Sequence, residues 1–382
     1  MSYRAFACTT ILALAACATS AAHSDGPSET AGDDGGALAD EGGASDAGGP
    51  DAAPDGERPL VCGKTGFCET KLPSSDVGEP LSLRSVWLVS STDVWSVSAE
   101  GFVLHWDGTT WTTAYRAAHA LSAVWASATD VWVAGERGLL LHLPTGGTWT
   151  RIETSHVEDI GGIHASSAKD IWFGHDSGVD HFDGTTLTSY TLPVSGLKFR
   201  SVFGRSGFGA YAAYVECADC ETSASTAFVF ELLPGQITEV NPSLRKWGLS
   251  PIAGVVTEDA DDDRRILLVG YSRMFDFVPW EYKYAFMGKG SVGFGYSNIT
   301  DMTFEEGTIP SRPIPSWVNG GNDIRVQIAI GVSLRWDGTD FVRTPSIDMG
   351  HDFVPRTLFA VHGDETETWL VGDGFALKGP TQ

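Results

Sequence analysis

Basic residues are scarce in this sequence. Its 382 residues include 25 lysines and arginines against 49 aspartates and glutamates, a formal net charge of −24. The first 60 residues carry ten of the acids, so residues 61–382 keep a charge of about −16. Such a surface repels phosphate backbones, and no basic stripe offsets it. We therefore expect no nucleic-acid partner.

Short enzyme motifs are also missing. The sequence contains no Gly-x-Ser-x-Gly elbow, no His-Glu-x-x-His pair, no phosphate-binding Gly-x-x-x-x-Gly-Lys-Ser/Thr loop and no dinucleotide fingerprint. This leaves the question of catalysis open, because a repeat protein can assemble an active site from several repeats. We assign no catalytic residue and no cofactor.

The apolar run near the N-terminus is too short to span a bilayer. It covers residues 9–16, follows one basic residue, Arg4, and ends in Leu14-Ala15-Ala16-Cys17. A short apolar region behind a positive start is typical of a secretory signal. The last four residues resemble the lipobox of bacterial lipoproteins.

This resemblance implies a membrane-anchored protein. Residues 1–17 would be the signal peptide, and Cys17 would become the first residue and carry the lipid on its thiol. In such lipoproteins a residue other than Asp after the cysteine, here Ala18, favours the outer membrane, facing the periplasm or the cell surface. The alternative is an ordinary signal peptide cleaved beyond Ala18, with Cys17 discarded.

Residues 18–60 contain no aromatic residue and almost no branched apolar one. They are rich in Ser, Ala, Gly, Asp and Glu, a composition that cannot bury enough surface to offset chain entropy. We predict a disordered acidic linker between the anchor and a folded part at residues 61–382.

Cysteine is rare, with six residues in all. Apart from Cys8 and Cys17, the cysteines form two pairs close in sequence, Cys62 with Cys68 and Cys217 with Cys220. An exported protein meets an oxidising compartment, so two local disulfides are expected. The alternatives are a four-cysteine zinc site, which conflicts with the spacing of the first pair, and redox chemistry at the second pair, where neighbouring acids raise the thiol pKa.

The most informative feature present is a unit that occurs three times in residues 83–190, at a spacing of 37 to 40 residues. Each copy contains an Asp-Val-Trp or Asp-Ile-Trp strand, which starts at Asp93, Asp130 and Asp170. A fixed period with several short strands per copy indicates a β-propeller, with one four-stranded antiparallel blade per copy. Weaker copies follow and give seven blades, with six or eight left open.

The C-terminal blade contains three strands, and its fourth is missing. An open sheet edge is an association hazard, so we expect residues 66–72 to supply this strand, braced by a Cys62–Cys68 bridge. In blade five we predict strands at 252–256, 265–271, 283–287 and 298–304.

By these repeats the chain resembles the propeller repeats of secreted bacterial lipoproteins. It is more distantly similar to the Asp-box repeats of sialidases and to WD-like extracellular propellers. The Asp-box resemblance implies that Asp107, Asp183 and Asp337 brace the hairpin between the third and fourth strands. The sialidase Phe/Tyr-Arg-Ile-Pro motif is absent, so the resemblance implies a scaffold and no particular chemistry.

Three histidines, His105, His142 and His181, recur at one repeat position. Metal ligands would have to converge, whereas equivalent positions of neighbouring blades are rotated around the ring. We therefore predict that each histidine hydrogen-bonds within its own blade.

One acidic segment is a candidate calcium loop. Asp259, Asp261 and Asp263 begin like an EF-hand loop, but Arg264 stands where the sixth-position glycine is needed. A solvated hairpin loop is the favoured interpretation. If the protein binds a metal, the sequence favours Ca²⁺.

Aromatic residues crowd the segment 274–284. Trp280 and Tyr282 would stack on a sugar ring, with Asp276 and Glu281 accepting from its hydroxyls. The alternative is that these residues pack an enlarged hairpin.

We interpret the chain as a membrane-anchored extracytoplasmic binding module with a monomeric propeller head. Its partner would be a glycan or an envelope protein. The alternatives are a carbohydrate-active hydrolase or lyase and a scaffold subunit of an envelope complex. Any site is expected where the repeat breaks, at residues 215–226, 258–264 and 274–284.

Overall fold

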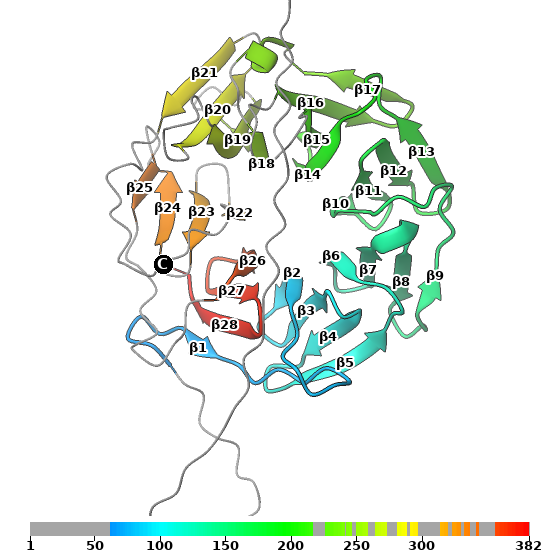
Figure 1. Ribbon diagram of the computed structural model, residues 1–382, viewed down its shortest axis with the longest axis vertical. Coiled ribbons are helices and arrows are strands. Elements are labelled where there is room, and N and C mark those ends of the chain that lie inside the picture. Colours follow the sequence, from blue (N-terminus) through cyan, green and yellow to red (C-terminus); the bar gives the residue numbers. More distant parts are fainter. Residues whose placement is uncertain are drawn as a thin grey trace, which may run out of the picture. The chain divides into compact units, whose positions relative to one another are not determined.

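In the residues that it describes, the computed structural model contains 28 strands in seven antiparallel sheets of four strands each. It describes residues 62–216, 226–240, 242–246, 250–258, 264–272, 281–288, 291–296, 314–319, 323–329, 332–336, 341–343 and 356–381. Figure 1 shows the sheets arranged around a ring, with strands such as β2, β6 and β10 nearest the centre. The predicted all-β propeller of four-stranded blades, seven in number, is confirmed.

The blades follow one another along the chain. Blade one contains β2 (Leu83–Ser90), β3 (Asp93–Ser98), β4 (Phe102–Trp106) and β5 (Trp111–Arg116). Blade two contains β6 (Leu121–Ala126), β7 (Asp130–Gly135), β8 (Leu140–Pro144) and β9 (Thr150–Arg151), with a 3₁₀ turn at Glu136–Gly138. Blade three contains β10 (Gly162–Ser167), β11 (Asp170–His175), β12 (Gly178–Phe182) and β13 (Leu187–Thr191).

The remaining blades keep the same order. Blade four contains β14 (Lys198–Arg205), β15 (Gly209–Glu216), β16 (Thr226–Leu233) and β17 (Gln236–Glu239), followed by a 3₁₀ turn at Pro242–Lys246. Blade five contains β18 (Ser250–Glu258), β19 (Arg264–Ser272), β20 (Glu281–Gly288) and β21 (Ser291–Tyr296). Blade six contains β22 (Ile314–Asn319), β23 (Asp323–Ala329), β24 (Val332–Trp336) and β25 (Phe341–Arg343). Blade seven contains β26 (Leu358–Gly363), β27 (Glu367–Gly372), β28 (Phe375–Pro380) and β1 (Cys68–Glu69).

Blade five departs from the prediction in its last strand. The fourth strand of the blade is β21, which begins at Ser291, so its prediction at 298–304 is wrong; that segment lies outside the described residues. Gly288 pairs directly with Ser291, so only two residues separate β20 from β21. A two-residue hairpin connection with a glycine is a strong turn signal, and the spacing of the earlier repeats does not show it.

The hairpins between third and fourth strands are built as the Asp-box resemblance implies. Asp107 Oδ1 accepts the backbone N–H groups of Thr109 and Thr110, both at 2.8 Å. Asp183 makes the same bonds in blade three. The glycine after Asp107, Gly108, has a φ of 99°, which favours glycine there. Asp337 lies outside the described residues.

Apolar side chains between neighbouring sheets form the core. The cluster that joins blades seven and one includes three tryptophans, and Trp369 lies 5.4 Å from Trp106 and 5.3 Å from Trp111 between ring centres. All three are at most 6% exposed. Large aromatic groups bury much surface and fill the gaps between blades, which accounts for the many tryptophans of the repeats.

The chain closes the ring with its N-terminal strand, as predicted. β1 pairs antiparallel with β28, and Cys68 lies opposite Lys378. The predicted disulfide between Cys62 and Cys68 is present. Phe67, 3% exposed, packs into the apolar cluster of blade seven. Among the described residues, no helix is long and apolar enough to cross a membrane.

Candidate functional site

The repeat histidines bond within their own blades, and the prediction for them is confirmed. Each lies on a third strand, and its Nε2 lies 2.8–3.0 Å from the aspartate that starts the second strand: His105 with Asp93, His142 with Asp130, and His181 with Asp170. Each ring also packs on the tryptophan of that strand. They stabilise separate blades and do not form a common site.

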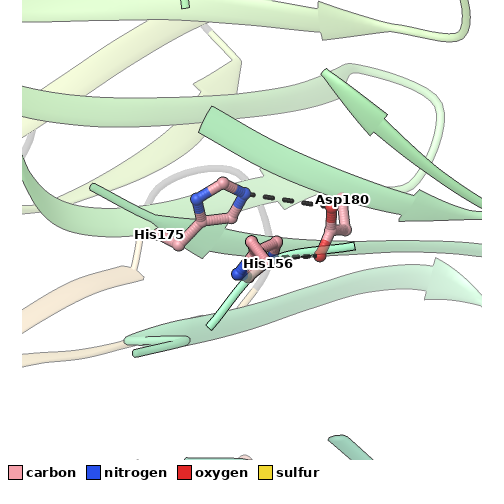
Figure 2. Close-up of side chains that lie close together, drawn as sticks. All are labelled: His156, His175 and Asp180. Carbon is pink, nitrogen blue, oxygen red and sulfur yellow. Dashed lines mark hydrogen bonds and ion pairs between the residues drawn. The ribbon is translucent and has the colours of Figure 1, made fainter. Parts of the chain in front are cut away.

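A different group of titratable side chains meets at blade three. His175 ends β11, Asp180 lies in β12, and His156 and Glu158 lie in the linker between β9 and β10. One potential ligand atom from each of His156, His175 and Asp180 lies within 4.8 Å of the other two. Figure 2 shows both imidazole rings beside the Asp180 carboxylate. We call these four residues the blade-three cluster.

The strand register shows that Asp180 occupies a buried leucine position of the repeat. Asp180 pairs with Phe173 in β11, and the same place in blades one, two and seven is taken by Leu104, Leu141 and Leu377. Those leucines are at most 1% exposed, and Asp180 is fully buried as well. A carboxylate in this buried layer costs several kcal/mol of stability unless it is paired. The other residues of the cluster therefore have to offset the cost of burying Asp180.

His175 is a second departure from the repeat. It stands at the end of the second strand, where blades one, two and seven have Ser98, Gly135 and Gly372. The side chain is only 5% exposed. Two neighbouring strands of blade three thus carry polar, titratable groups at positions that blades one, two and seven fill with small or apolar residues.

The four side chains form a chain of contacts. His156 Nε2 lies 2.8 Å from Asp180 Oδ2, and His175 Nδ1 lies 2.9 Å from Glu158 Oε2. The two imidazole rings stack with their centres 4.0 Å apart. His175 Nε2 lies 3.9 Å from Asp180 Oδ1, which is too long for a hydrogen bond. These last two atoms are buried and have no hydrogen-bond partner among the described residues.

The two histidines of the cluster have pKa values shifted in opposite directions because their surroundings differ. The hydrogen bond to Asp180 raises the pKa of His156, whereas burial lowers the pKa of His175. Burial by itself would raise the pKa of Glu158, but hydrogen bonds from Ser177 and His175 bring it below its usual value. The hydrogen bond to the Glu158 carboxylate places a ring proton of His175 on Nδ1. In the neutral form of the ring, which burial favours, Nε2 then carries a lone pair.

Backbone contacts fasten the linker to the turns beside it. Gly138 N donates to the Glu158 carbonyl at 2.8 Å, and Ser177 N and Oγ donate to the Glu158 carboxylate at 3.0 and 2.8 Å. The turn of blade two, the linker and the turn of blade three are therefore joined through one residue. Between His156 and Glu158, Val157 is 80% exposed.

These elements lie on one face of the ring. All seven sheets have the same strand order and antiparallel pairing, so the ends of all second strands, and the linkers between blades, face the same side. We call it the turn-and-linker face. β15 and β19 also end on this face, at Glu216 and Ser272, next to two of the regions where sites were expected, 215–226 and 274–284.

Most of the other predicted site residues fall where the structure gives no description. Cys17, the pair Cys217 and Cys220, and the aspartates at 259–263 lie outside the described residues, as do Asp276 and Trp280. Glu281 and Tyr282 are the first residues of β20, opposite Ser272 and Tyr271. Their roles as ligand contacts stay predictions.

The blade-three cluster was not among the predicted sites. Sites were expected only where the repeat breaks, whereas this cluster lies inside a well-marked copy. The signal is a change of residue type at two repeat positions, His175 and Asp180, and the strand pairing of the structure supplies the register that exposes it.

Comparisons with known proteins identify the fold. No family model and no curated protein matches the chain. One similar solved structure is YCF48 bound to D1 peptide, which is 14% identical, matches 85% of this chain and all of that one, and has a TM-score of 0.57. Another is the WD40 propeller domain of Doa1, which is 13% identical, matches 83% of this chain and 98% of that one, and has a TM-score of 0.53. An extracellular domain of a putative two-component system from B. thetaiotaomicron also matches (13%, 82% of this chain and 39% of that one, 0.54). The chain is a β-propeller protein similar in fold to WD40 and bacterial extracellular propellers.

Proposed function

We propose that this protein is a membrane-anchored extracytoplasmic binding module that recognises its partner with the turn-and-linker face. The observation that carries the proposal is the blade-three cluster, where buried charge and an exposed Val157 replace the regular repeat. Polar groups retained in an apolar layer at a cost in stability are typical of functional sites.

Two further features support the proposal. The fold is one that displays loops from several blades on a single face, which suits partner binding. The bacterial neighbour is described as an extracellular domain and YCF48 as bound to a peptide, in agreement with an exported binding protein. The lipobox-like Leu14-Ala15-Ala16-Cys17 supports the anchor.

A site-specific photocrosslinker tests which face binds. We would place it at Val157 on the turn-and-linker face and, as the matched control, at Ala128, an exposed residue in the turn between β6 and β7 on the opposite face. In intact cells of the source bacterium, Val157 is expected to yield one defined adduct with an envelope protein or glycan, and Ala128 none. Equal crosslinking from both positions, or none from either, contradicts the proposed face.

The anchor has its own test. Cys17→Ser should release the protein from the membrane fraction into the soluble fraction, because the lipid-bearing thiol is lost. Unchanged membrane fractionation of this variant contradicts the lipoprotein assignment, whatever the crosslinking result.

A further inference from the structure

Two buried acceptor atoms face each other in the blade-three cluster. Glu158 holds the His175 proton on Nδ1, so His175 Nε2 presents a lone pair to Asp180 Oδ1 at 3.9 Å. Both side chains are at most 5% exposed. Two electron-rich atoms that face each other in an apolar layer repel unless an electrophile lies between them.

The separation fits a metal ion of zinc type. Zinc binds imidazole nitrogen at about 2.0–2.1 Å and carboxylate oxygen at about 2.0–2.2 Å. The two bonds together reach about 4.1 Å, so an ion spans the 3.9 Å gap at a wide angle. A contraction of about 0.5 Å brings the pair to a tetrahedral angle.

The surrounding residues complete a typical ligand environment. His156 Nε2, now 2.8 Å from Asp180 Oδ2, supplies a third donor once the ion displaces its proton to solvent. Glu158 accepts from the nitrogen of His175 that does not face Asp180, the arrangement that orients metal-bound histidines. His156 is 14% exposed and Glu158 40%, so an ion can reach the site from the surface.

We propose that His156, His175 and Asp180 form a binding site for one divalent transition metal ion, with Glu158 as the positioning residue of His175. Imidazole and carboxylate donors suit zinc, and a set of three protein ligands leaves a fourth position for water or for a donor from a bound molecule. The metal site is a property beyond the proposed binding function, and it can be tested without knowing the partner.

Zinc titration of the full chain tests the proposal. We expect one Zn²⁺ per chain, retained on dialysis, and visible d–d absorption of a four-coordinate site when Co²⁺ replaces it. Asp180→Leu and His175→Ser, which restore residues found in other blades, should each weaken zinc binding by roughly 100-fold or more, and Glu158→Gln by about 10–100-fold.

The control is His142→Gln in blade two. His142 pairs with Asp130 at the same 2.8 Å that separates His156 from Asp180, but among the described residues it belongs to no cluster of three potential ligands. Zinc affinity should be unchanged in this variant. Circular dichroism verifies folding, and if Asp180→Leu fails to fold, His175→Ser and Glu158→Gln carry the test.

Two results would overturn the proposal. One is that no zinc binds at concentrations up to about 100 μM, at which even weak specific sites fill. The gap between His175 Nε2 and Asp180 Oδ1 would then hold water. The other is stoichiometric binding that His175→Ser and Glu158→Gln leave intact, which would place the ion on other ligands. Neither result bears on the crosslinking test of the binding face.

Discussion

Replacing Thr70 by valine will weaken the closure of the ring. Thr70 follows β1, is 3% exposed, and connects three parts of the molecule. Its Oγ1 donates to the Ala376 carbonyl of β28 at 3.0 Å and accepts the indole N–H of Trp111 in β5 at 2.9 Å. One hydroxyl thus ties the N-terminal strand to the last blade and to the first.

The magnitude follows from the groups that lose a partner. Valine has nearly the shape of threonine, so packing changes little, but the buried Trp111 N–H has no remaining acceptor. An unsatisfied buried donor costs about 1–3 kcal/mol. We expect the free energy of unfolding to fall by about 2 kcal/mol, and the midpoint of thermal unfolding by a few degrees.

Urea unfolding followed by tryptophan fluorescence and by circular dichroism measures this change. Thr70→Ser keeps the hydroxyl and should stay much closer to the wild type. Thr112→Val removes an exposed hydroxyl bonded to the His105 carbonyl at 3.3 Å and should change stability by no more than about 0.5 kcal/mol. The reasoning is refuted if Thr70→Val is as stable as Thr112→Val, or if Thr70→Ser is as unstable as Thr70→Val.

Three further predictions concern blades seven and three. Desolvation lowers the pKa of His362 to about 4, against about 6.5 in the unfolded chain. Between pH 6.5 and 4 only the unfolded chain takes up the proton. The free energy of unfolding therefore falls as the pH drops through this range. The loss of stability is at most about 3 kcal/mol, and it is smaller because the residue is partly exposed. Urea titrations at pH 7 and pH 4.5 measure this loss, and the variant His362→Asn should not show it. Gly174→Ala would place its Cβ 2.0 Å from the Phe199 ring and should cost about 1–3 kcal/mol or more, partly recovered by Phe199→Leu in thermal unfolding. Backbone N–H groups, first that of Thr186, lower the pKa of Asp183 to about 2; Asp183→Ala should speed amide exchange at Thr186, and Asp183→Asn, which keeps the acceptor, should not.

The blades that the sequence predicts best are those whose turns and strands carry their own local signals. In blade one, Asp93-Val94-Trp95, Gly101 and Asp107-Gly108 fix a strand and two turns. Blade five has no such markers, and its last strand was misplaced because register there depends on pairing with β20. Ring closure was predictable for a different reason, since an open edge on the last blade required a strand from elsewhere.

The blade-three cluster was hidden by a change in spacing. From the turn glycine to the repeat histidine there are four positions in blades one and two, Gly101 to His105 and Gly138 to His142, but three in blade three, where His181 follows Gly178.

Alignment by the turn glycine sets Asp180 against Val103 and Leu140, whereas alignment by the histidine sets it against Leu104 and Leu141. The sequence by itself therefore does not show which position of the repeat Asp180 takes. The pairing of Asp180 with Phe173 settles the alignment. His156 comes from a linker outside the repeat pattern, so its approach to Asp180 depends on the packing of blade two against blade three. A site made from two altered strand positions and the linker between two blades becomes visible only when three-dimensional register is known.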